Sequence, residues 1–489
     1  MNLRIYTTKN GTIVSPYKRG LLRSVERSTS SYDHVYHKSV EETGFLVNNF
    51  GGGSAFITHS VSPELLLPLI DRGYTLYKMP WNIPKPLGSR LTLQIDTQLR
   101  DYQGDIVVEI MQTSNHYHEW FINLQTDMGK TITGIELIHQ FGTKAMVVCF
   151  RNVILNQWKE KLMDKTTAVA ERIHFINGSK ELEKMYNGEF PTDDYDIYLV
   201  NPATLTSYFR SHDYRHMHRI FDELGIGTLI YDEAHRNMGL VVKMNATTNT
   251  RATIYLSADY AQGELRREDR YYDIFKNTKI IRMEKDQAEE YKHTKILVVD
   301  FDTKPSVNDT VSINNKYGYS ADNYMKYEFK KGRILEVLRH LVENIIKTRK
   351  PEYRTLIFFT NKWAADEAYN YLSGFFADSG VTFGEYHGDI PEDHKEWARK
   401  KANVLIATYS SLNTGFDEEN IKYVIGTNQS NKIEDNQTSG RGRPMKDGTD
   451  NVYMMLVDVG FSYCKKKLRQ RLGYLMETKA KDRPVWYHM

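Results

Sequence analysis

The chain has 489 residues, of which 40% are hydrophobic and 26% charged, and its formal net charge is +3. This length exceeds what one hydrophobic core supports, so about three domains are expected, and the near-neutral charge neither requires nor excludes a nucleic-acid partner. No segment approaches the ~20 apolar residues that span a bilayer, so no membrane segment is predicted. The two cysteines, Cys149 and Cys464, argue against a disulfide framework and favour a reducing cytoplasm.

The first 92 residues predict a small α+β accessory domain. Short β-rich pieces, GFLVNNF and SAFITHS, accompany one predicted helix in SPELLLPLIDRGY. The following segment PWNIPKPLGSRL contains three prolines and is predicted to be a connector. Basic and aromatic residues in PYKRG and LYKMPW lead to the hypothesis that this domain binds DNA.

Residues 93–295 alternate apolar β runs with helical stretches, which predicts a parallel sheet covered by helices. The β runs are AMVVCF, IHFING, IYLVNP, TLIYDEA and TIYLSA. A second series occupies residues 331–489, with TLIFFT, VLIATY, YVIGTN and VYMMLVDV. The polar residues 296–330 between the two series are predicted to form a linker region. The pattern therefore predicts an α/β protein with two tandem units, and ligands of such sheets bind beyond the carboxyl ends of the strands.

The stretch FINLQTDMGKTITGIELIHQF has the order strand, loop, helix that a phosphate-binding loop requires. Gly129, Lys130 and Thr131 match the end of the pattern, but Leu124 stands where the first glycine is usual. An acid beside phosphates is unfavourable, so the Asp127 side chain is expected to cap the turn or the helix instead. The predicted nucleotide-binding residues are Thr126, Asp127, Met128, Gly129, Lys130 and Thr131.

A second signal is TLIYDEAHR, in which an apolar β run ends in two carboxylates. This arrangement predicts Asp232 and Glu233 at the carboxyl edge of the sheet, beside the phosphate loop. There Asp232, together with the Thr131 hydroxyl, is expected to hold Mg²⁺. Glu233 is expected to polarise the water that attacks the γ-phosphate of ATP. Lys130 and Glu233 are therefore predicted catalytic residues.

The combination of D-E-A-H after a strand with G-K-T upstream resembles a superfamily 2 helicase or translocase. This resemblance implies two RecA-like domains, ATP and Mg²⁺, and a nucleic-acid partner. LRDYQ is similar to the element that reads adenine, which gives Gln103 that role. MVVCFRNVILNQW and LVNPATL resemble backbone-contacting motifs, which imply nucleic-acid contacts for Arg151 and Thr204. YLSADY begins like the S-A-T motif, but Asp259 replaces its threonine.

The second unit contains further segments that resemble motifs of this family. VLIATYSSLNTGFDEEN implies a backbone contact for Thr408 and places Gly415 and Asp417 near the nucleotide. QTSGRGRP resembles the arginine-finger motif that begins at Gln437. Its second arginine, Arg443, is one position early, so both Arg441 and Arg443 are predicted to reach the γ-phosphate and stabilise its developing charge.

LRDYQ, the short D-E-A-H core and the amino-terminal module are similar to phage branch-migration helicases of the UvsW type. The resemblance implies ATP-driven remodelling of forks, Holliday junctions and R-loops, in recombination, repair and replication, inside a bacterial host. Two alternatives stay open: an RNA helicase, because D-E-A-H does not distinguish the sugars, and a nucleotide-gated clamp that binds without separating strands.

The sixteen histidines raise the further alternative of a metal-dependent hydrolase. His216 and His218 are two residues apart, a spacing that does not place both on one face of a helix, so a solvated helix is favoured over a metal site. His387 in YHGDI resembles a motif of the second unit, and a structural role is equally open.

Overall fold

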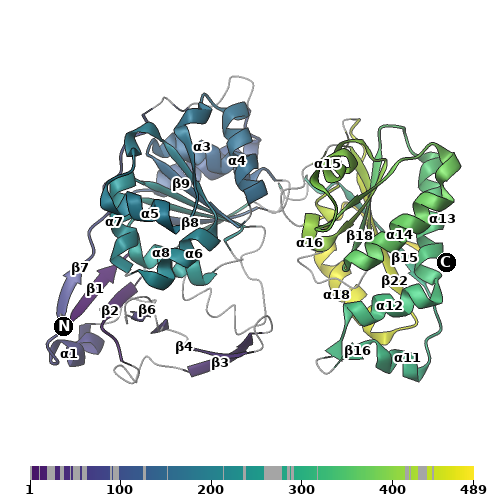
Figure 1. The fold of residues 1–489 in the computed structure, drawn as a ribbon, viewed down its shortest axis with the longest axis horizontal. Helices are drawn as coiled ribbons and strands as arrows, with labels where there is room; N and C mark the ends of the chain where they lie inside the picture. Colours follow the sequence, from purple (N-terminus) through teal and green to yellow (C-terminus); the bar gives the residue numbers. More distant parts are fainter. Residues whose placement is uncertain are drawn as a thin grey trace. The chain divides into compact units, whose positions relative to one another are not determined.

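The computed structural model describes residues 3–489 apart from 10, 19–27, 34–37, 44–45, 48–54, 58–62, 89–90, 92–97, 125–127, 151, 213, 235–237, 258–277, 284–286, 288–290, 316–317, 413–417, 419, 428–437, 443–444 and 446. The chain divides into two compact units: Met1–Leu124 with Met128–Met283, and Glu284–Met489. Each unit is built around one seven-stranded parallel sheet (Figure 1). In the described part of the chain, no helix combines the length and the apolar character needed to cross a membrane.

The sheet of the first unit has the strand order β10-β11-β9-β12-β13-β8-β14, and all its neighbours are parallel. Its central strands are almost entirely buried because helices cover both faces, α3 and α4 on one side and α6, α7 and α8 on the other (Figure 1). The elements are α2 (Asp101–Thr113), β8 (Glu119–Asn123), α3 (Lys130–Phe141), β9 (Ala145–Cys149), α4 (Asn152–Lys165), β10 (Ile173–Ile176), α5 (Ser179–Asn187), β11 (Ile197–Val200), α6 (Pro202–Ser211), α7 (Tyr214–Leu224), β12 (Thr228–Asp232), α8 (Met238–Thr247), β13 (Ala252–Ser257) and β14 (Lys279–Arg282).

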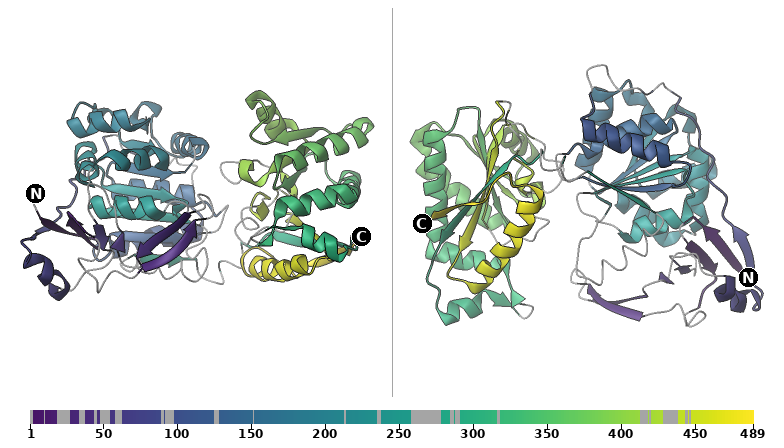
Figure 2. Two further views of the ribbon diagram at one scale, coloured as in Figure 1. Left: turned by 60° about the horizontal axis from the view of Figure 1, so that its bottom comes forward. Right: turned by 180° about the vertical axis from the view of Figure 1, so that it is seen from behind.

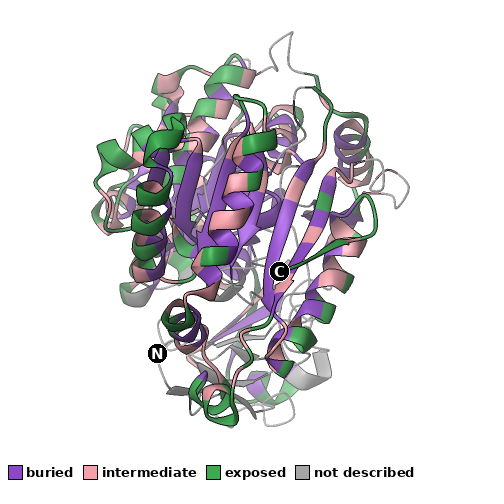
Figure 3. Ribbon diagram, turned by 90° about the vertical axis from the view of Figure 1, so that its right-hand side faces the viewer, coloured by how far each residue is buried: buried purple, intermediate pink, exposed green. Residues whose placement is uncertain are grey.

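The sheet of the second unit has the order β19-β20-β18-β21-β22-β15-β23. Counted in chain order, both sheets arrange their seven strands as 3-4-2-5-6-1-7, so the second unit repeats the topology of the first. Figure 3 shows buried strands between helices that expose their outer faces. The elements are β15 (Thr294–Phe301), α11 (Val307–Ser312), α12 (Ala321–Lys331), α13 (Arg333–Thr348), β18 (Arg354–Phe359), α14 (Lys362–Phe375), β19 (Phe383–Tyr386), α15 (Glu392–Lys401), β20 (Val404–Thr408), α16 (Tyr409–Leu412), β21 (Ile421–Gly426), β22 (Asn451–Asp458), α18 (Ser462–Thr478) and β23 (Val485–His488).

These sheets confirm the predicted α/β fold with two tandem parallel-sheet units. Every apolar β run quoted from the sequence forms a strand, and the helix predicted after G-K-T is α3. The prediction of a linker over residues 296–330 is wrong. Residues 296–301 belong to β15, which pairs with both β22 and β23, and α11 and α12 follow. The buried alternation of TKILVVDF makes it a strand of the second sheet, whereas the polar composition after it had suggested a linker.

The amino-terminal residues form a five-stranded sheet of order β5-β6-β2-β1-β7 and confirm the small α+β module. β1 (Arg4–Thr8) pairs antiparallel with β2 (Gly11–Ser15) and parallel with β7 (Thr75–Lys78). α1 (Pro63–Ile70) packs Leu66 and Leu69 against Ile5 and Val14. Figure 2 shows this module beside the first parallel sheet. The remaining short elements are β3 (Ser28–Asp33), β4 (Lys38–Thr43), β5 (Leu46–Val47), β6 (Ala55–Ile57), β16 (Asn314–Asn315) and β17 (Gly318–Tyr319).

The proline-rich connector runs across the amino ends of the strands of the first sheet. We call residues 79–88 the amino-edge belt. Its contacts are Asn249 Nδ2 to Met79 O (2.9 Å), Lys85 N to Gly225 O (2.9 Å), Leu87 N to Gly142 O (3.1 Å) and Gly88 N to Asp196 Oδ1 (2.7 Å). The partners on the sheet side lie just before strands β13, β12, β9 and β11. The belt therefore lies at the edge of the sheet opposite the carboxyl ends, where ligands of such folds bind.

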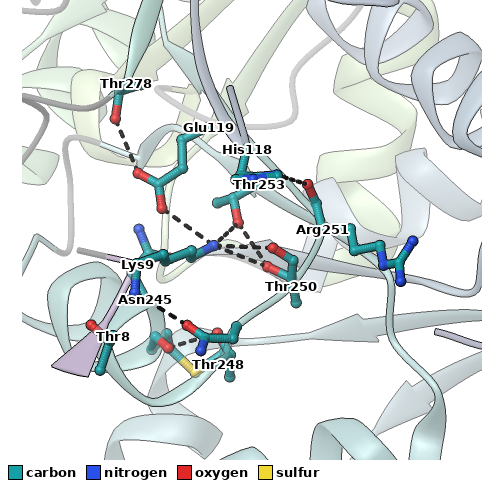
Figure 4. A network of polar contacts seen from close by, with 12 residues as sticks. Thr8, Lys9, His118, Glu119, Asn245, Thr248, Thr250, Arg251, Thr253 and Thr278 are labelled. Carbon is teal, nitrogen blue, oxygen red and sulfur yellow. Dashed lines mark hydrogen bonds and ion pairs between the residues drawn. The ribbon is translucent and has the colours of Figure 1, made fainter. Parts of the chain in front are cut away.

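A buried ion pair fixes the turn between β1 and β2 to the same edge. Nζ of Lys9 lies 3.3 Å from Oε1 of Glu119, the first residue of β8, and both side chains are at most 5% exposed (Figure 4). The ammonium also donates to the Thr253 hydroxyl at 2.9 Å and to Thr250, while Glu119 accepts from Tyr255 at 3.1 Å. Because these charges are paired and hydrogen-bonded, the module is tied to the core of the first unit rather than loosely attached.

Candidate nucleotide-binding site

The G-K-T loop joins the carboxyl end of β8 to the first turn of α3. Gly129 has φ +68°, in the left-handed region that favours glycine, and α3 begins at Lys130. Nζ of Lys130 donates to the carbonyl oxygen of Leu124 at 3.3 Å. Leu124, which stands in place of the first glycine, thus contributes its backbone to orienting the lysine. The amino end of α3 presents backbone N–H groups that favour an anion.

Gln103 braces this loop. Its Nε2 donates to the carbonyl oxygen of Gly129 at 3.2 Å, and its Oε1 accepts from the N–H of Arg100 at 2.9 Å. The Tyr102 hydroxyl donates to the carbonyl oxygen of Met128 at 2.9 Å. A Cβ atom on Gly129 would lie only 2.3 Å from Nε2 of Gln103, so a larger residue there would require the end of the glutamine side chain to move. The structure thus brings Gln103 to the nucleotide loop, and its role in reading adenine stays a prediction.

The two carboxylates of D-E-A-H lie at the carboxyl end of β12. Oε1 of Glu233 is 3.6 Å from Nζ of Lys130. Glu233 has φ +53°, an uncommon conformation for a residue with a side chain, and such backbone strain concentrates at functional sites. Asp232 accepts a hydrogen bond at 2.8 Å from the indole N–H of Trp158, a residue of α4. The structure therefore brings Lys130, Asp232 and Glu233 together as the sequence predicts.

Burial, followed by repulsion from the neighbouring Glu233 carboxylate, raises the pKa of Asp232. The hydrogen bond from Trp158 and the charge of Lys130 act in the opposite direction, towards the ionised form. Asp232 and the Thr131 hydroxyl offer oxygen donors, the ligands that Mg²⁺ prefers. The donor set at this edge therefore fits Mg²⁺ and not a soft metal.

A polar groove of about 630 Å³ lies at the carboxyl ends of β10 and β11. Its walls include Asn152 and Asn156 of α4, Asn177 after β10, Asn201 at the N-cap of α6 and Thr204 in the first turn of α6. Asn201 caps α6 by accepting from the Ala203 N–H at 2.8 Å and donates to Asn152 Oδ1 at 3.1 Å. Thr204, a predicted nucleic-acid contact, therefore lies in a groove rich in amide groups.

The second unit holds two of the predicted site residues that the structure describes, Thr408 and Arg441. Thr408 is 1% exposed and its hydroxyl lies 3.0 Å from Ser411 Oγ, whereas the neighbouring Ser410 is exposed. Arg441 is partly exposed and follows the short turn that begins at Thr438. The remaining predicted site residues lie outside the described residues, as does Asp259: Thr126, Asp127, Arg151, Gly415, Asp417, Gln437 and Arg443.

The turn of the second unit that corresponds in topology to the phosphate loop follows β15. There the carboxylate of Asp458 accepts hydrogen bonds from the backbone N–H of Gly460 at 2.8 Å and from the backbone N–H and hydroxyl of Thr303. A buried carboxylate at this place disfavours a phosphate group. The two units share one topology. Among the described residues, however, only the first unit has the sequence features of a phosphate-binding loop after its first sheet strand.

The histidines noted in the sequence serve other purposes in the structure. His216 stacks on Tyr186 with ring centres 4.1 Å apart. His218 lies 3.2 Å from Asp222 and 3.1 Å from the carbonyl oxygen of Pro80 in the amino-edge belt. Both are half-buried packing residues, so the favoured solvated helix is only partly right. His387 is buried and pairs with Asp366 at 2.7 Å.

The sequence reasoning missed the role of two residues. Trp158 ends the segment MVVCFRNVILNQW, in which only Arg151 was given a role, although its indole N–H donates to Asp232. Lys9 was not singled out, because a lysine in a turn is usually exposed and its partner Glu119 lies 110 positions away in the chain. No local sequence signal marks either contact, since both depend on elements that meet only in the fold.

Known helicases are similar in sequence to parts of this chain. Residues 96–260 match the family model described as "Type III restriction enzyme, res subunit". The chain is 23% identical over 188 residues to a candidate DNA 3′-5′ helicase, Rad25, of Halobacterium salinarum; that alignment covers 38% of this chain and 27% of the relative. It is 24% identical to a candidate helicase, 161L, of Invertebrate iridescent virus 6, with 71% of this chain and 74% of the relative covered.

Among solved structures, S. cerevisiae Dbp5 bound to RNA and ADP BeF3 superposes with a TM-score of 0.52 at 15% identity, covering 80% of this chain and 90% of that one. This likeness supports the fold. The two parallel-sheet units are the fold that this chain shares with Dbp5. Over part of its length the chain is similar to superfamily 2 helicases. Two further relatives are named XPB, a DNA 3′-5′ helicase of Mycobacterium tuberculosis and a helicase/translocase subunit of Enterocytozoon bieneusi. The chain spans less than a third of the length of the Rad25 and XPB relatives that it matches.

Proposed function

We propose that this protein is an ATP-driven DNA helicase or translocase that remodels branched DNA. The observation that carries the proposal is the meeting of Lys130 with Glu233, 3.6 Å apart, at the carboxyl edge where Asp232 also lies. A cation for the phosphates, a carboxylate for the attacking water and an oxygen ligand for a divalent cation are the groups that phosphoryl transfer to water requires.

In this proposal Lys130 binds the β- and γ-phosphates of ATP at the amino end of α3, and the loop residues Thr126 to Gly129 enclose them. Thr131 and Asp232 would hold Mg²⁺, which supplies positive charge against the phosphates when bound. Glu233 orients the attacking water. Gln103 reads the adenine edge and, through its contacts with Gly129, can sense whether the loop is occupied.

The second unit contributes Arg441 and Arg443 in this proposal. A guanidinium that approaches the γ-phosphate stabilises the charge that develops there, an effect of about 10³ to 10⁵ in rate. Gly415, Asp417 and Gln437 are proposed to lie near the nucleotide when the two units come together. Hydrolysis would then release that closure and move one unit relative to the other along the nucleic acid.

The amide-rich groove is the proposed path for a sugar-phosphate backbone in the first unit. Amide N–H groups and the Thr204 hydroxyl can donate to phosphate oxygens without reading the bases. Arg151, which directly precedes α4 in the sequence, and Thr408, in the second unit, are proposed to add further backbone contacts. Because the described groove is lined by amides, its contribution to binding is expected to depend less on salt than that of a lysine-rich surface.

DNA is favoured over RNA because the Rad25 and XPB relatives are named as DNA helicases. The choice of branched DNA rests on the resemblance to UvsW-type phage helicases. The test compares stimulation of ATP hydrolysis by a fork, a Holliday junction, a linear duplex and single-stranded RNA, with strand separation followed on labelled substrates. Greatest stimulation by forks or junctions, with branch migration, supports the proposal.

The same experiment distinguishes the alternatives. Stronger stimulation by RNA, with unwinding of RNA duplexes and no action on branched DNA, would identify an RNA helicase. Nucleotide-dependent binding without strand separation on any substrate would identify a clamp. Either result would refute the proposed function.

The amino-terminal module is proposed to contribute to DNA binding. Its edge strand β7 is exposed, with Tyr77 stacked on Tyr6 at a ring distance of 5.4 Å and Arg4 close to the Tyr77 ring. Deleting residues 1–90 would test this, but it would also remove Lys9 and the amino-edge belt from the core. The substitution Tyr77→Ala is a cleaner test, and an unchanged preference for forks over linear duplex would discard the idea.

A further inference from the structure

The side chain of Trp158 links three elements of the candidate nucleotide site. It belongs to α4, is fully buried, and donates its indole N–H to Oδ2 of Asp232 at 2.8 Å. This hydrogen bond has good geometry for a neutral donor and a carboxylate acceptor. The two residues are 74 positions apart in the sequence, so the donor–acceptor distance depends on how α4 packs on the sheet.

The packing around the indole leaves little freedom for it to turn. A Cβ atom on Gly134 of α3 would lie 2.7 Å from Cη2 of Trp158, 3.2 Å from Leu256 and 3.6 Å from Ile230. The absence of a side chain at Gly134 therefore lets the ring fit between α3 and the sheet. Because the ring is enclosed on this side, the direction of its N–H, and with it one oxygen of Asp232, is fixed.

An oriented carboxylate matters at this place. A metal-binding carboxylate is commonly held by an outer hydrogen bond, and the loss of such a partner typically weakens metal binding about 10- to 100-fold. Without the indole N–H, Asp232 would be free to rotate away from Glu233, whose like charge lies in the next residue. The hydrogen bond opposes this rotation.

The same helix reaches the amide-rich groove. Asn152, Leu155 and Asn156, in the first turns of α4, line the groove, and Trp158 follows on the next turn. A small cavity lined by Phe150, Pro202 and Glu233 lies between the segments that begin α4 and α6 and the carboxylates. Helix α4 therefore lines the groove and, through Trp158, also contacts Asp232.

We propose that Trp158 is a positioning residue, whose indole N–H holds Asp232 in the orientation that binds the divalent cation and ties that orientation to the groove helix α4. This inference rests on the proposed function in one respect, the use of Asp232 as a cation ligand. It makes no demand on whether the nucleic acid is DNA or RNA, or on whether its strands are separated.

The test uses Trp158→Phe in the full chain, which keeps an aromatic ring and removes the N–H. Binding of Mn²⁺ to the protein with ADP is measured by electron paramagnetic resonance. The expected result is about 10-fold weaker Mn²⁺ binding than in the unsubstituted protein. The matched control is Trp120→Phe, since Trp120 is equally buried and donates its indole N–H to Thr113, away from the site. Its Mn²⁺ affinity is expected to be unchanged.

Gly134→Ala provides a second variant that keeps the indole and displaces it, should Trp158→Phe fail to fold. Thermal unfolding identifies the variants that are folded, and the same weakening is expected for Gly134→Ala. Equal Mn²⁺ affinity in Trp158→Phe and the unsubstituted protein, or equal weakening in Trp120→Phe, would overturn the inference. If nucleic acid stimulates ATP hydrolysis by the unsubstituted protein, but Trp158→Phe leaves the Mn²⁺ affinity unchanged, this inference alone is refuted. Absence of that hydrolysis would refute the proposed function.

Discussion

The Nζ atom of Lys130 lies 3.6 Å from Oε1 of Glu233, although the strands that precede the two residues, β8 and β12, are separated in the sheet by β13. The contact forms because both residues project from the carboxyl edge of one parallel sheet. A triphosphate would compete for the lysine, and Glu233 would then be available to a water molecule.

Glu233→Gln is expected to reduce ATP hydrolysis about 10²- to 10⁴-fold while nucleotide binding is retained, because the amide keeps the shape of the side chain but cannot act as a base. Phosphate release measures hydrolysis, and a fluorescent ATP analogue measures binding. Glu160→Gln, an exposed position on α4, is the control and is expected to leave both unchanged. Full hydrolysis by Glu233→Gln would remove the glutamate from the proposed chemistry.

Gly129→Ala is expected to weaken nucleotide binding. The residue has φ +68°, and the new Cβ would lie 2.3 Å from Nε2 of Gln103, so the loop and the glutamine must both shift. The left-handed conformation alone costs an alanine about 1–2 kcal/mol. Gly142→Ala is the control that separates the cost of the left-handed backbone from the contact with Gln103. Gly142 has φ +61° at the other end of α3, and the nearest atom to its Cβ would be the carbonyl oxygen of His139, at 3.9 Å. Equal nucleotide affinities in the two variants would contradict this account.

Arg441→Ala is expected to lower ATP hydrolysis about 10³- to 10⁵-fold with little loss of nucleotide binding, because the guanidinium is proposed to act only on the developing charge. The comparison with Arg443→Ala shows which arginine has the larger effect. Arg469→Ala on the exposed face of α18 serves as the control. Unchanged hydrolysis in both Arg441→Ala and Arg443→Ala would show that the second unit does not supply an arginine finger.

Lys9→Met is expected to destabilise the first unit by about 3–5 kcal/mol, because it leaves the Glu119 carboxylate buried without its cation. Chemical denaturation followed by circular dichroism measures the free energy of unfolding. Adding Glu119→Gln to Lys9→Met removes the uncompensated charge while keeping an acceptor for Tyr255, so the double variant is expected to recover part of the loss. Lys18→Met, at an exposed position, is expected to have little effect. A double variant less stable than Lys9→Met would contradict the explanation.

The carboxyl of Glu385 predicts a pH dependence of stability in the second unit. Burial, and then the nearby Asp366 carboxylate, raises the pKa of Glu385 to about 7 from an ordinary value of 4.5. The folded state therefore binds a proton more tightly than the unfolded chain. The resulting stabilisation is complete below about pH 4.5 and is lost as the pH rises through 7.

Glu385→Gln removes this dependence because its amide stays neutral. The melting temperature of the unsubstituted protein minus that of Glu385→Gln is expected to fall as the pH rises from 5 to 8. The scale is about 2–4 °C per kcal/mol for a unit of this size. Differential scanning calorimetry at several pH values measures the difference. A difference that is constant over this range would show that Glu385 does not titrate there.

The two-unit fold was predictable because each central strand is buried on both faces and is therefore a continuous apolar run in the sequence. The edge strands were harder to predict. β23 is exposed along its whole length and β14 is only partly buried, so neither has a distinctive pattern. The assignment of β15 was also missed, because its place beside β22 depends on pairing across about 150 positions.

For the candidate site, residues that are contiguous in the chain were enough to predict that Gly129 to Thr131 and the Asp232–Glu233 pair lie at the carboxyl edge of one sheet. Phosphate loops and acidic strand ends are local arrangements of backbone and side chain, and their chemistry follows from a few neighbouring residues. The packing of distant elements decided the rest: that Gln103 braces the loop, that Trp158 donates a hydrogen bond to Asp232, and that Lys9 pairs with Glu119. Hydrogen bonds and ion pairs act over about 3 Å, so contacts between remote segments exist only once the sheet has brought them together.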